Sequence, residues 1–323
     1  AVMANIRLVT EHLHRASDGT IRFFRLGRSP RGQDRFLDRE GCCWRLLTHI
    51  GNSRTLEQLE NSAQARAIGG LLGRFHRLTA DLAPEQLADP LPGFHVTPRY
   101  LQHYDTLRAG VDWGSERERR CAETIEELRP LARVLEDARP LLSQRVIHGD
   151  PKVANFLLSA EGDRAVSLID LDTVKPGLLL HDLGDCLRSC CNPLGEVHHD
   201  PAAVSFVPEL FAELMAGYGE QAGDLLGTGD RALLVRSAAV ISFELGLRFF
   251  TDHLAGNLYF RVGWPGQNLH RALIQLHLTR SILGQQPDLE HRLKTLFSVS
   301  DPQSLMTDPP SVGAACNCRP VGL

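Results

Sequence analysis

The chain has 323 residues, of which 43% are hydrophobic and 23% are charged, and its formal net charge is −4. This composition is that of an ordinary globular protein, long enough for one large or two modest domains. It has no basic excess that would suggest nucleic acid as a partner, and no apolar run approaches the roughly 20 residues of a membrane span. No signal-peptide pattern opens the sequence, and eight cysteines at this length favour a reducing cytoplasm over a disulfide scaffold.

The first fifty residues predict one helix and an antiparallel pair of strands. Apolar residues recur at helical spacing over residues 2–15. Residues 21–26 and 43–48 have the apolar and aromatic content of strands, and the turn Asp38-Arg-Glu-Gly41 leads into the second of them. Gly51-Asn-Ser53 then interrupts the pattern and marks a hinge-like boundary.

The rest of the chain is predicted to be mainly helical, with short strands only around its most polar motif. A helix is expected over residues 56–78, a proline-rich loop over residues 89–98, and a charged amphipathic helix over residues 116–138. Short strands are expected at residues 145–147, 156–158 and 166–169, and helices at about residues 181–190, 204–218, 229–254, 267–283 and 289–297.

This order predicts an α+β fold with two unequal parts. Residues 1–52 form a small mixed part that ends in the hinge, and residues 53–300 form a large helical part that carries the polar motif. Residues 301–323 contain Asp-Pro and Pro-Pro steps without periodicity, so we expect a disordered tail there. Ligands favour the crevice between two such parts, and the functional groups are expected to face it.

A polar run after the first of these short strands has the spacing of a phosphoryl-transfer centre. Asp150 follows an apolar strand and a glycine, so its carboxylate can accept a proton from a substrate hydroxyl. Asn155 lies five residues later and Asp170 ends the third short strand, and their oxygen atoms suit Mg²⁺. Lys152 can reach a transferring phosphoryl group, and His148 is expected to brace the loop. Asp and Asn are also common turn residues, but their joint order and spacing favour phosphoryl transfer.

Three further aspartates follow the run. Asp172 lies two residues after Asp170, and it is either an additional residue of the metal site or a cap at the strand end. Asp182 and Asp185 open a predicted helix, where carboxylates favour the positive end of the helix dipole. Structural bracing is therefore the favoured role of these two residues.

A group of thiols and imidazoles lies in the same region. Cys186 and Cys190 are one helical turn apart, and His198 and His199 are near in sequence. A zinc site is disfavoured, because no second Cys-x-x-Cys pair supplies the missing ligands and buried free thiols are common.

The run His148-Gly-Asp-Pro-Lys-Val-Ala-Asn155, together with Ile169-Asp170, resembles the Brenner motif of the aminoglycoside phosphotransferase and choline kinase superfamily. This resemblance implies a protein-kinase-like bilobal fold with a small N-lobe and a mostly helical C-lobe. It also implies ATP as co-substrate and Mg²⁺ as cofactor. Carried over by position, Asp150 would be the catalytic base, and Asn155 and Asp170 would be the magnesium ligands.

Three longer stretches resemble one branch of this superfamily, the bacterial N-acetylhexosamine 1-kinases. The stretches are Ile169-Asp-Leu-Asp-Thr-Val-Lys-Pro-Gly177 with His181-Asp-Leu-Gly-Asp185, Phe94-His-Val-Thr-Pro98, and Phe243-Glu-Leu-Gly-Leu-Arg-Phe-Phe-Thr-Asp-His-Leu-Ala-Gly-Asn-Leu-Tyr-Phe260 with Asn268-Leu-His-Arg-Ala272. The resemblance covers roughly residues 2–285. It implies that ATP phosphorylates the anomeric hydroxyl of N-acetylglucosamine or N-acetylgalactosamine.

In the third stretch, Arg248 and Tyr259 match positions that contact the sugar in this family. Spacing alone offers another interpretation, because Glu244, Arg248 and Asp252 share one helix face and would form a ladder of salt bridges. The resemblance favours sugar contact for Arg248 and Tyr259, and it hardly changes the interpretation of Glu244. Asp252 is a further candidate for the row that faces the sugar.

Two features of a complete kinase are not visible, namely a flexible loop over the nucleotide phosphates and a basic residue on an early strand. The opening helix resembles one that follows the first strands in this family, so we expect a truncated N-lobe. Two alternatives stay open: a catalytically impaired, kinase-like binding protein, and a kinase for an aminoglycoside or amino alcohol. Sites for polycationic aminoglycosides need many carboxylates, and the pair of Arg248 and Tyr259 suits a neutral sugar better.

Overall fold

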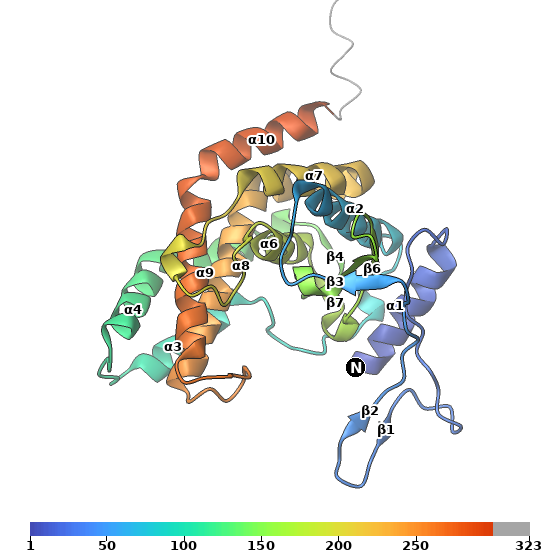
Figure 1. The fold of residues 1–323 in the computed structure, drawn as a ribbon, viewed down its shortest axis with the longest axis horizontal. Coiled ribbons are helices and arrows are strands. Elements are labelled where there is room, and N and C mark those ends of the chain that lie inside the picture. The colour runs from blue at the N-terminus through green and yellow to red at the C-terminus, as the bar shows by residue number, and fades with distance from the viewer. Residues whose placement is uncertain (300–323) are drawn as a thin grey trace, which may run out of the picture.

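The computed structural model describes residues 1–299, which form an α+β fold with a mainly helical body (Figure 1). The predicted tail at residues 301–323 lies outside the described residues. The helices are α1 (Val2–Ala16), α2 (Ser62–Leu78), α3 (Thr97–Arg108), α4 (Glu116–Leu128), α5 (Val134–Ala138), α6 (Leu179–Cys190), α7 (Pro208–Ala222), α8 (Thr228–Leu254), α9 (Gln267–Gly284) and α10 (Gln286–Val299). The strands are β1 (Phe36–Leu37), β2 (Cys43–Trp44), β3 (Ser53–Thr55), β4 (Gln144–Ile147), β5 (Phe156–Ser159), β6 (Ala165–Leu168) and β7 (Lys175–Leu178).

The N-terminal part consists of α1, an extended segment and a hairpin of β1 and β2 that projects from the body (Figure 1). Helix α1 forms as predicted. The predicted pair of longer strands is reduced to one bridge between Leu26 and Leu47. A full strand at residues 21–26 was a wrong prediction, since the main-chain N–H of Arg22 instead donates to Val166 O, 2.9 Å away.

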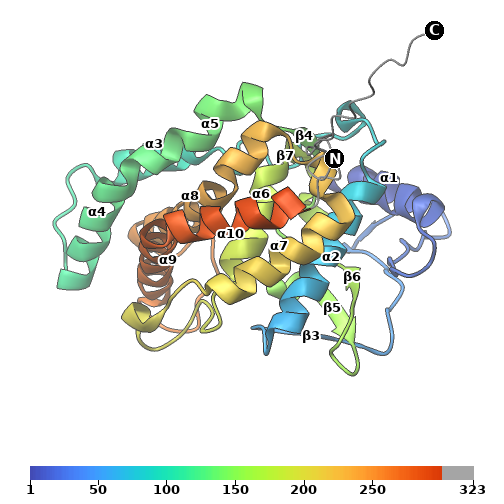
Figure 2. The same cartoon turned by 90° about the horizontal axis from the view of Figure 1, so that it is seen from above.

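The helical body is organised around α6, which is buried along almost its whole length, from Leu179 to Arg188. Helix α2 packs along α7, and α8 packs along α9 and against α6 (Figure 2). Helices α3 and α4 lie at one end of the molecule and α1 lies at the other (Figures 1 and 2). Within residues 1–299, none of the helices combines the length and the apolar content required to cross a bilayer.

Three helical segments differ from the predictions. Helix α2 begins at Ser62, not at residue 56, because the side chain of Asn61 caps it by accepting from the N–H of Gln64 at 3.0 Å. The helix predicted over residues 116–138 is broken, because Pro130 has no N–H and opens a 3₁₀ segment between α4 and α5. Helix α3 was not predicted, although proline is well tolerated in a first helical turn.

Two small sheets hold the polar motif. Strands β3, β5 and β6 form an antiparallel sheet in that order, and β4 pairs with β7 in a second antiparallel sheet. Strand β7 was not predicted, because it contains Pro176 and Gly177, which are rare in strands. Gly177 is needed at this position, since an added Cβ would lie 2.3 Å from a methyl carbon of Ile147 on β4.

Candidate active site

The loop between β4 and β5 is held through its backbone by one buried carboxylate. Asp182, in the first turn of α6, accepts from the main-chain N–H groups of His148 at 2.7 Å and Gly149 at 2.8 Å. Its Oδ2 also lies 2.9 Å from His76 Nε2. Burial raises the pKa of Asp182, but the hydrogen bond and charge of His76 outweigh burial, and the net shift of the pKa is downward. Asp182 therefore braces the loop as an ionised group.

Asp150, Lys152 and Asn155 are brought together on this loop. Lys152 Nζ lies 2.5 Å from Asp150 Oδ2, and Asn155 Nδ2 donates to the same oxygen at 3.2 Å and to the main-chain oxygen of Asp150 at 2.8 Å. Burial raises the pKa of Asp150, and the charge of Asp185 adds to this shift while Lys152 and His148 oppose it. A carboxylate with a raised pKa is better matched to accepting a proton than an ordinary aspartate.

Asp170 and Asn155 face a different cavity from Asp150. They line a space of about 840 Å³ that also contacts the segment around Leu47 and Ile50. Asp170 follows β6 in a left-handed conformation, with φ of 65°, which is uncommon for a residue other than glycine. The carboxylate of Asp170 makes no hydrogen bond with any of residues 1–299, and the side-chain amide oxygen of Asn155 likewise accepts no hydrogen bond from them.

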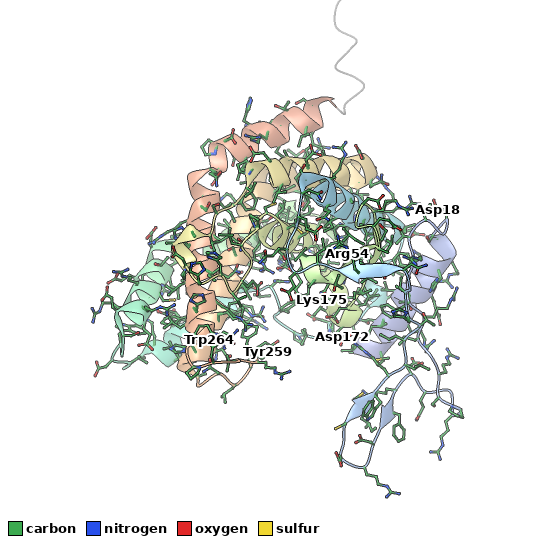
Figure 3. All side chains as sticks on the ribbon, viewed as in Figure 1. Asp18, Arg54, Asp172, Lys175, Tyr259 and Trp264 are labelled. Atoms are coloured by element: carbon green, nitrogen blue, oxygen red, sulfur yellow. The ribbon has the colours of Figure 1, made fainter. Side chains whose placement is uncertain are left out.

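Asp172 is engaged with the N-terminal part of the chain. Its Oδ1 lies 2.5 Å from Arg45 Nη1, and the two side chains are 45% and 31% exposed. Figure 3 labels Asp172, which follows β6, and Tyr259, which lies on the loop after α8. Asp172 thus has an ion-pair partner, which neither of its two predicted roles included. Arg45 also lines the cavity that contains Asp170.

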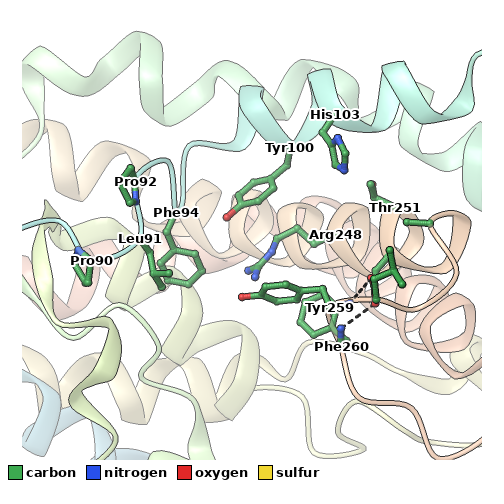
Figure 4. A pocket seen from close by; sticks show the side chains of 13 residues that line it. Pro90, Leu91, Pro92, Phe94, Tyr100, His103, Arg248, Thr251, Tyr259 and Phe260 are labelled. Carbon is green, nitrogen blue, oxygen red and sulfur yellow. Dashed lines mark hydrogen bonds between the residues drawn. The ribbon is translucent and has the colours of Figure 1, made fainter. Parts of the chain in front are cut away.

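Arg248 lies among four aromatic rings in a cavity of about 470 Å³ (Figure 4). Its guanidinium carbon is 5.0 Å from the ring centre of Tyr100, 5.2 Å from Phe94, 5.4 Å from Phe260 and 5.8 Å from Tyr259. Arg248 makes no ion pair or hydrogen bond with any described residue. Burial raises the pKa of Tyr100 to about 12, although the charge of Arg248 opposes this shift, so the phenol stays neutral.

Asp252 supports the loop that follows α8. One carboxylate oxygen accepts from the N–H of Tyr259 at 2.8 Å, and the other accepts from the N–H of Phe260 at 2.9 Å (Figure 4). Asn268 Nδ2 donates to Asp252 Oδ2 at 2.9 Å. The predicted substrate-facing residue Asp252 therefore positions Tyr259 by its carboxylate, while Tyr259 itself is 70% exposed.

The salt-bridge ladder suggested by the spacing of Glu244, Arg248 and Asp252 does not form among residues 1–299. Glu244 is buried and receives hydrogen bonds from His95 Nδ1 at 3.0 Å and Thr97 Oγ1 at 2.7 Å. The ladder fails because each of the two carboxylates has nearer donors on another segment, which helical spacing cannot reveal.

The cavity around Arg248 adjoins a second one that contains Asp150. This second cavity has a volume of about 320 Å³ and is also lined by Lys152 and Asp185. Five residues line both cavities, namely Leu91, Phe94, Arg248, Tyr259 and Phe260. The structure therefore brings the predicted base and the two predicted sugar-contacting residues to one continuous space.

Cys186 and Cys190 have no neighbours among residues 1–299 that would complete a metal centre with them. Cys186 and Cys190 are buried with their sulfur atoms 3.9 Å apart. Among residues 1–299, no cluster of three or more His, Cys, Asp or Glu side chains has a geometry that holds a metal ion. Burial raises the pKa of Cys186, so the thiol stays protonated and is a poor metal ligand.

A family model described as the phosphotransferase enzyme family matches residues 15–232, which is more than half of the chain. The chain belongs to this phosphotransferase family. The superfamily prediction is thereby confirmed, and the match supports a phosphotransferase. The matched range contains the loop with Asp150 and Asn155 and also Asp170, whereas Arg248 and Tyr259 lie beyond it.

Solved structures share the fold of this phosphotransferase at low sequence identity. An aminoglycoside phosphotransferase from Alicyclobacillus acidocaldarius has a TM-score of 0.62 at 15% identity, over 90% of this chain and 85% of that chain. A choline/ethanolamine kinase family protein from Mesorhizobium loti has a TM-score of 0.54 at 18% identity, over 91% and 84% of the two chains. The predicted kinase-like α+β fold, with a small N-lobe and a helical C-lobe, is confirmed.

Several residues of the site were not predicted from the sequence. The rings of Phe94, Tyr100 and Phe260 surround Arg248, and His95 links Glu244 to the loop. The stretch from Phe94 to Pro98 belongs to the family resemblance, which assigns it no role. The sequence signal for a functional role of this stretch was an aromatic residue, a histidine and a threonine that precede a proline at the start of a helix.

Proposed function

We propose that this protein transfers the γ-phosphoryl group of ATP to a hydroxyl of an N-acetylhexosamine, and that the acceptor is the anomeric hydroxyl. Support comes from its membership in the phosphotransferase family and from the stretches that resemble N-acetylhexosamine 1-kinases. In this proposal, residues 1–52 act as the small lobe and residues 53–300 as the large lobe, with nucleotide bound near the hinge around Leu47.

The observation that carries the choice of acceptor is the position of Arg248. Its positive charge has no acidic partner among the described residues, and it lies in the space that leads to Asp150. Arg248 would repel a cationic acceptor, such as an amino alcohol or an aminoglycoside, from the aromatic cavity, where the carboxylate of Asp252 is already engaged by three N–H donors. A neutral sugar can instead accept hydrogen bonds from the guanidinium and pack against the surrounding rings.

The two sides of the proposed site have different tasks. Asp150 orients the acceptor hydroxyl and accepts its proton, and Lys152 lies close enough to stabilise charge on the transferred group. Asn155 and Asp170 offer unused oxygen atoms in the other cavity, and this donor set fits Mg²⁺, which prefers carboxylate and amide oxygens together with phosphates. When bound, the metal ion neutralises phosphate charge during transfer.

An acceptor screen tests the proposal. The protein is incubated with Mg·ATP and one acceptor at a time, and ADP release is measured beside phosphorus NMR of the product. N-acetylglucosamine or N-acetylgalactosamine should yield an anomeric phosphate faster than choline, ethanolamine or kanamycin is phosphorylated. Faster transfer to one of these cationic acceptors would contradict the proposal. Absence of transfer to every acceptor, together with absence of ATP binding by calorimetry, would favour an impaired binding protein.

A substitution at Arg248 tests its part in acceptor binding. Arg248→Ala removes the donors and the charge, so the KM for the hexosamine should rise at least about tenfold, since a lost hydrogen bond to a charged group is worth roughly 1.5–3 kcal/mol. The KM for ATP should change little. Arg119→Ala, an exposed arginine on α4, is the matched control. An unchanged KM and kcat for the hexosamine in Arg248→Ala would remove this residue from the site.

A further inference from the structure

His95 connects two segments that lie far apart in the sequence. Its Nδ1 is 3.0 Å from Glu244 Oε1 and its Nε2 is 2.9 Å from the main-chain oxygen of Gly149. The main-chain oxygen is an acceptor only, and so is the carboxylate of Glu244 in its ionised form, so both ring nitrogens carry a hydrogen in this arrangement. The geometry fits a positively charged imidazolium that donates to the loop between β4 and β5 on one side and to α8 on the other.

The surroundings of His95 fix this ring in place. The side chain is buried, and its ring centre lies 4.0 Å from that of Phe94 and 5.1 Å from that of His181. Burial lowers the pKa of His95, but the charge of Glu244 and their hydrogen bond outweigh burial, and the net shift is upward. The backbone of His95 has φ of 63°, a conformation that a non-glycine residue adopts at a cost of about 1–3 kcal/mol.

The two partners of His95 are adjacent to the two halves of the proposed site. Gly149 precedes Asp150, and its N–H already donates to Asp182. The peptide units around Gly149 are thus held from both sides, by Asp182 through the N–H and by His95 through the oxygen. Glu244 lies one helical turn before Arg248 on α8, so the same ion pair also fixes the helix that presents Arg248.

We propose that His95 is a positioning residue that sets the distance between Asp150 and the bound acceptor. It does so by linking the main-chain oxygen of Gly149, on the loop between β4 and β5, to Glu244 on α8, the helix that carries Arg248. This inference rests on the proposed function, because it assigns the acceptor to the cavity between these two segments. His95 touches neither substrate in this scheme. Its effect is on alignment, and a misplacement of about 1 Å can reduce turnover by about 10²-fold.

The test compares His95→Leu with the double variant His95→Leu/Glu244→Leu. The single variant leaves a buried carboxylate without its charged partner, whereas the double variant removes both charged groups and can make neither of the two hydrogen bonds of His95. We expect kcat for acceptor phosphorylation to fall about 10²-fold in both, while the KM for ATP changes less than about threefold. His291→Gln, on the exposed surface of α10, serves as the control. An unchanged kcat in the double variant, or an equal loss of ATP binding, would overturn the proposal.

A second measurement keeps the inference independent of the acceptor's identity. Exchange of the main-chain amide hydrogens of residues 148–150 is followed in the wild-type protein and in the double variant without substrates. Loss of the His95 contact should increase exchange in this segment at least about tenfold, because the contact restricts its local opening. Unchanged exchange would overturn the proposal even if no acceptor is phosphorylated. Failure of the acceptor screen with increased exchange would instead count against the proposed function alone.

Discussion

At the scale of single residues, Asp150 is arranged so that one of its two carboxylate oxygens is free. Lys152 and Asn155 both bind Oδ2, and no residue of the described chain donates to Oδ1. The bound oxygen fixes the orientation of the carboxylate, and the free oxygen retains lone pairs for a hydroxyl proton. This division of the two oxygens suits a base that must be both fixed and available.

Asp150→Asn should abolish this proton acceptance while keeping shape and volume. We expect kcat to fall by about 10²–10⁴-fold, the usual contribution of a positioned general base, with the KM for ATP nearly unchanged. Calorimetric titration with Mg·ATP and a thermal unfolding curve check that nucleotide binding and folding persist. Asp112→Asn, in an exposed loop, is the control. Near-normal turnover of Asp150→Asn with the hexosamine would refute its role as the base.

At the scale of elements, α2 and α7 are in direct backbone contact through small residues. A Cβ added to Gly69 would lie 1.9 Å from the main-chain oxygen of Leu214, and one added to Gly217 would lie 2.1 Å from that of Arg66. Neighbouring Gly70 has ordinary room, since its added Cβ would lie 3.7 Å from the nearest oxygen. These distances provide a matched pair of substitutions within one helix.

Gly69→Ala should destabilise the protein by about 2 kcal/mol or more, because two packed helices would have to separate. Gly70→Ala should be neutral or stabilising by up to about 1 kcal/mol, since alanine is the better helix former. Urea unfolding of both variants, followed by circular dichroism, provides the comparison. Equal stability of the two variants would mean that the helices are not in backbone contact.

The first turn of α6 contains a histidine that responds to pH. Both ring nitrogens of His181 lack a hydrogen-bond partner among residues 1–299. Burial, followed by the charge of His95, lowers the pKa of His181 well below its ordinary value. The folded state therefore holds His181 neutral, whereas the unfolded state takes up a proton below about pH 6.5. Stability from this group is present above pH 6.5 and is lost as pH falls.

His181→Leu should remove this acid sensitivity. Between pH 7.5 and 5.5, the wild-type protein should lose about 1.4 kcal/mol of unfolding free energy through His181, following the linkage of proton binding to folding. The variant should lose correspondingly less, and His291→Leu should behave as the wild type. Urea unfolding at both pH values measures the difference. An identical pH dependence in His181→Leu and the wild type would contradict the buried neutral state.

Element prediction succeeded where the signal was local. Helices α8 and α9 follow from their long apolar periodicity, and their observed bounds lie within a few residues of those expected. Strand β7 and the break at Pro130 were missed for opposite reasons. In β7, pairing with β4 overrides the poor strand propensity of Pro176 and Gly177, and at Pro130 one residue overrides a continuous helical pattern.

At the scale of the whole molecule, Arg45 and Asp172 connect the N-terminal part to the region after β6. Their side chains are substantially exposed, so the pair should contribute only about 0–1 kcal/mol to stability. The consequence of the contact is therefore geometric, since it holds Arg45 beside the cavity that contains Asp170.

Arg45→Ala and Asp172→Ala should have similar, modest effects on the KM for ATP, and the double variant should be no worse than either single variant. Steady-state kinetics at several Mg²⁺ concentrations measures these effects. A loss of kcat by orders of magnitude in Asp172→Ala alone, with a changed Mg²⁺ dependence, would instead identify Asp172 as part of the metal site.

The candidate site was predictable only where its residues are close in sequence. Asp150 and Asn155 are five residues apart, and a short loop suffices to bring their side chains together. The contact between His95 and Glu244 joins segments about 150 residues apart, and no spacing rule anticipates it. Asp252 shows the same limit, because two of its three partners are main-chain N–H groups, which nearly every residue has, so the sequence does not single them out.

Within the part of the chain that the structure describes, two segments, residues 90–103 and 248–260, line the aromatic cavity around Arg248. None of these lining residues belongs to the segment from Asp150 to Asp170. Substitutions in one region can therefore accumulate while the other keeps its sequence, so acceptor preference can diverge among descendants without loss of the transfer chemistry. A library confined to the aromatic cavity is accordingly the most economical starting point for directed evolution towards a new acceptor.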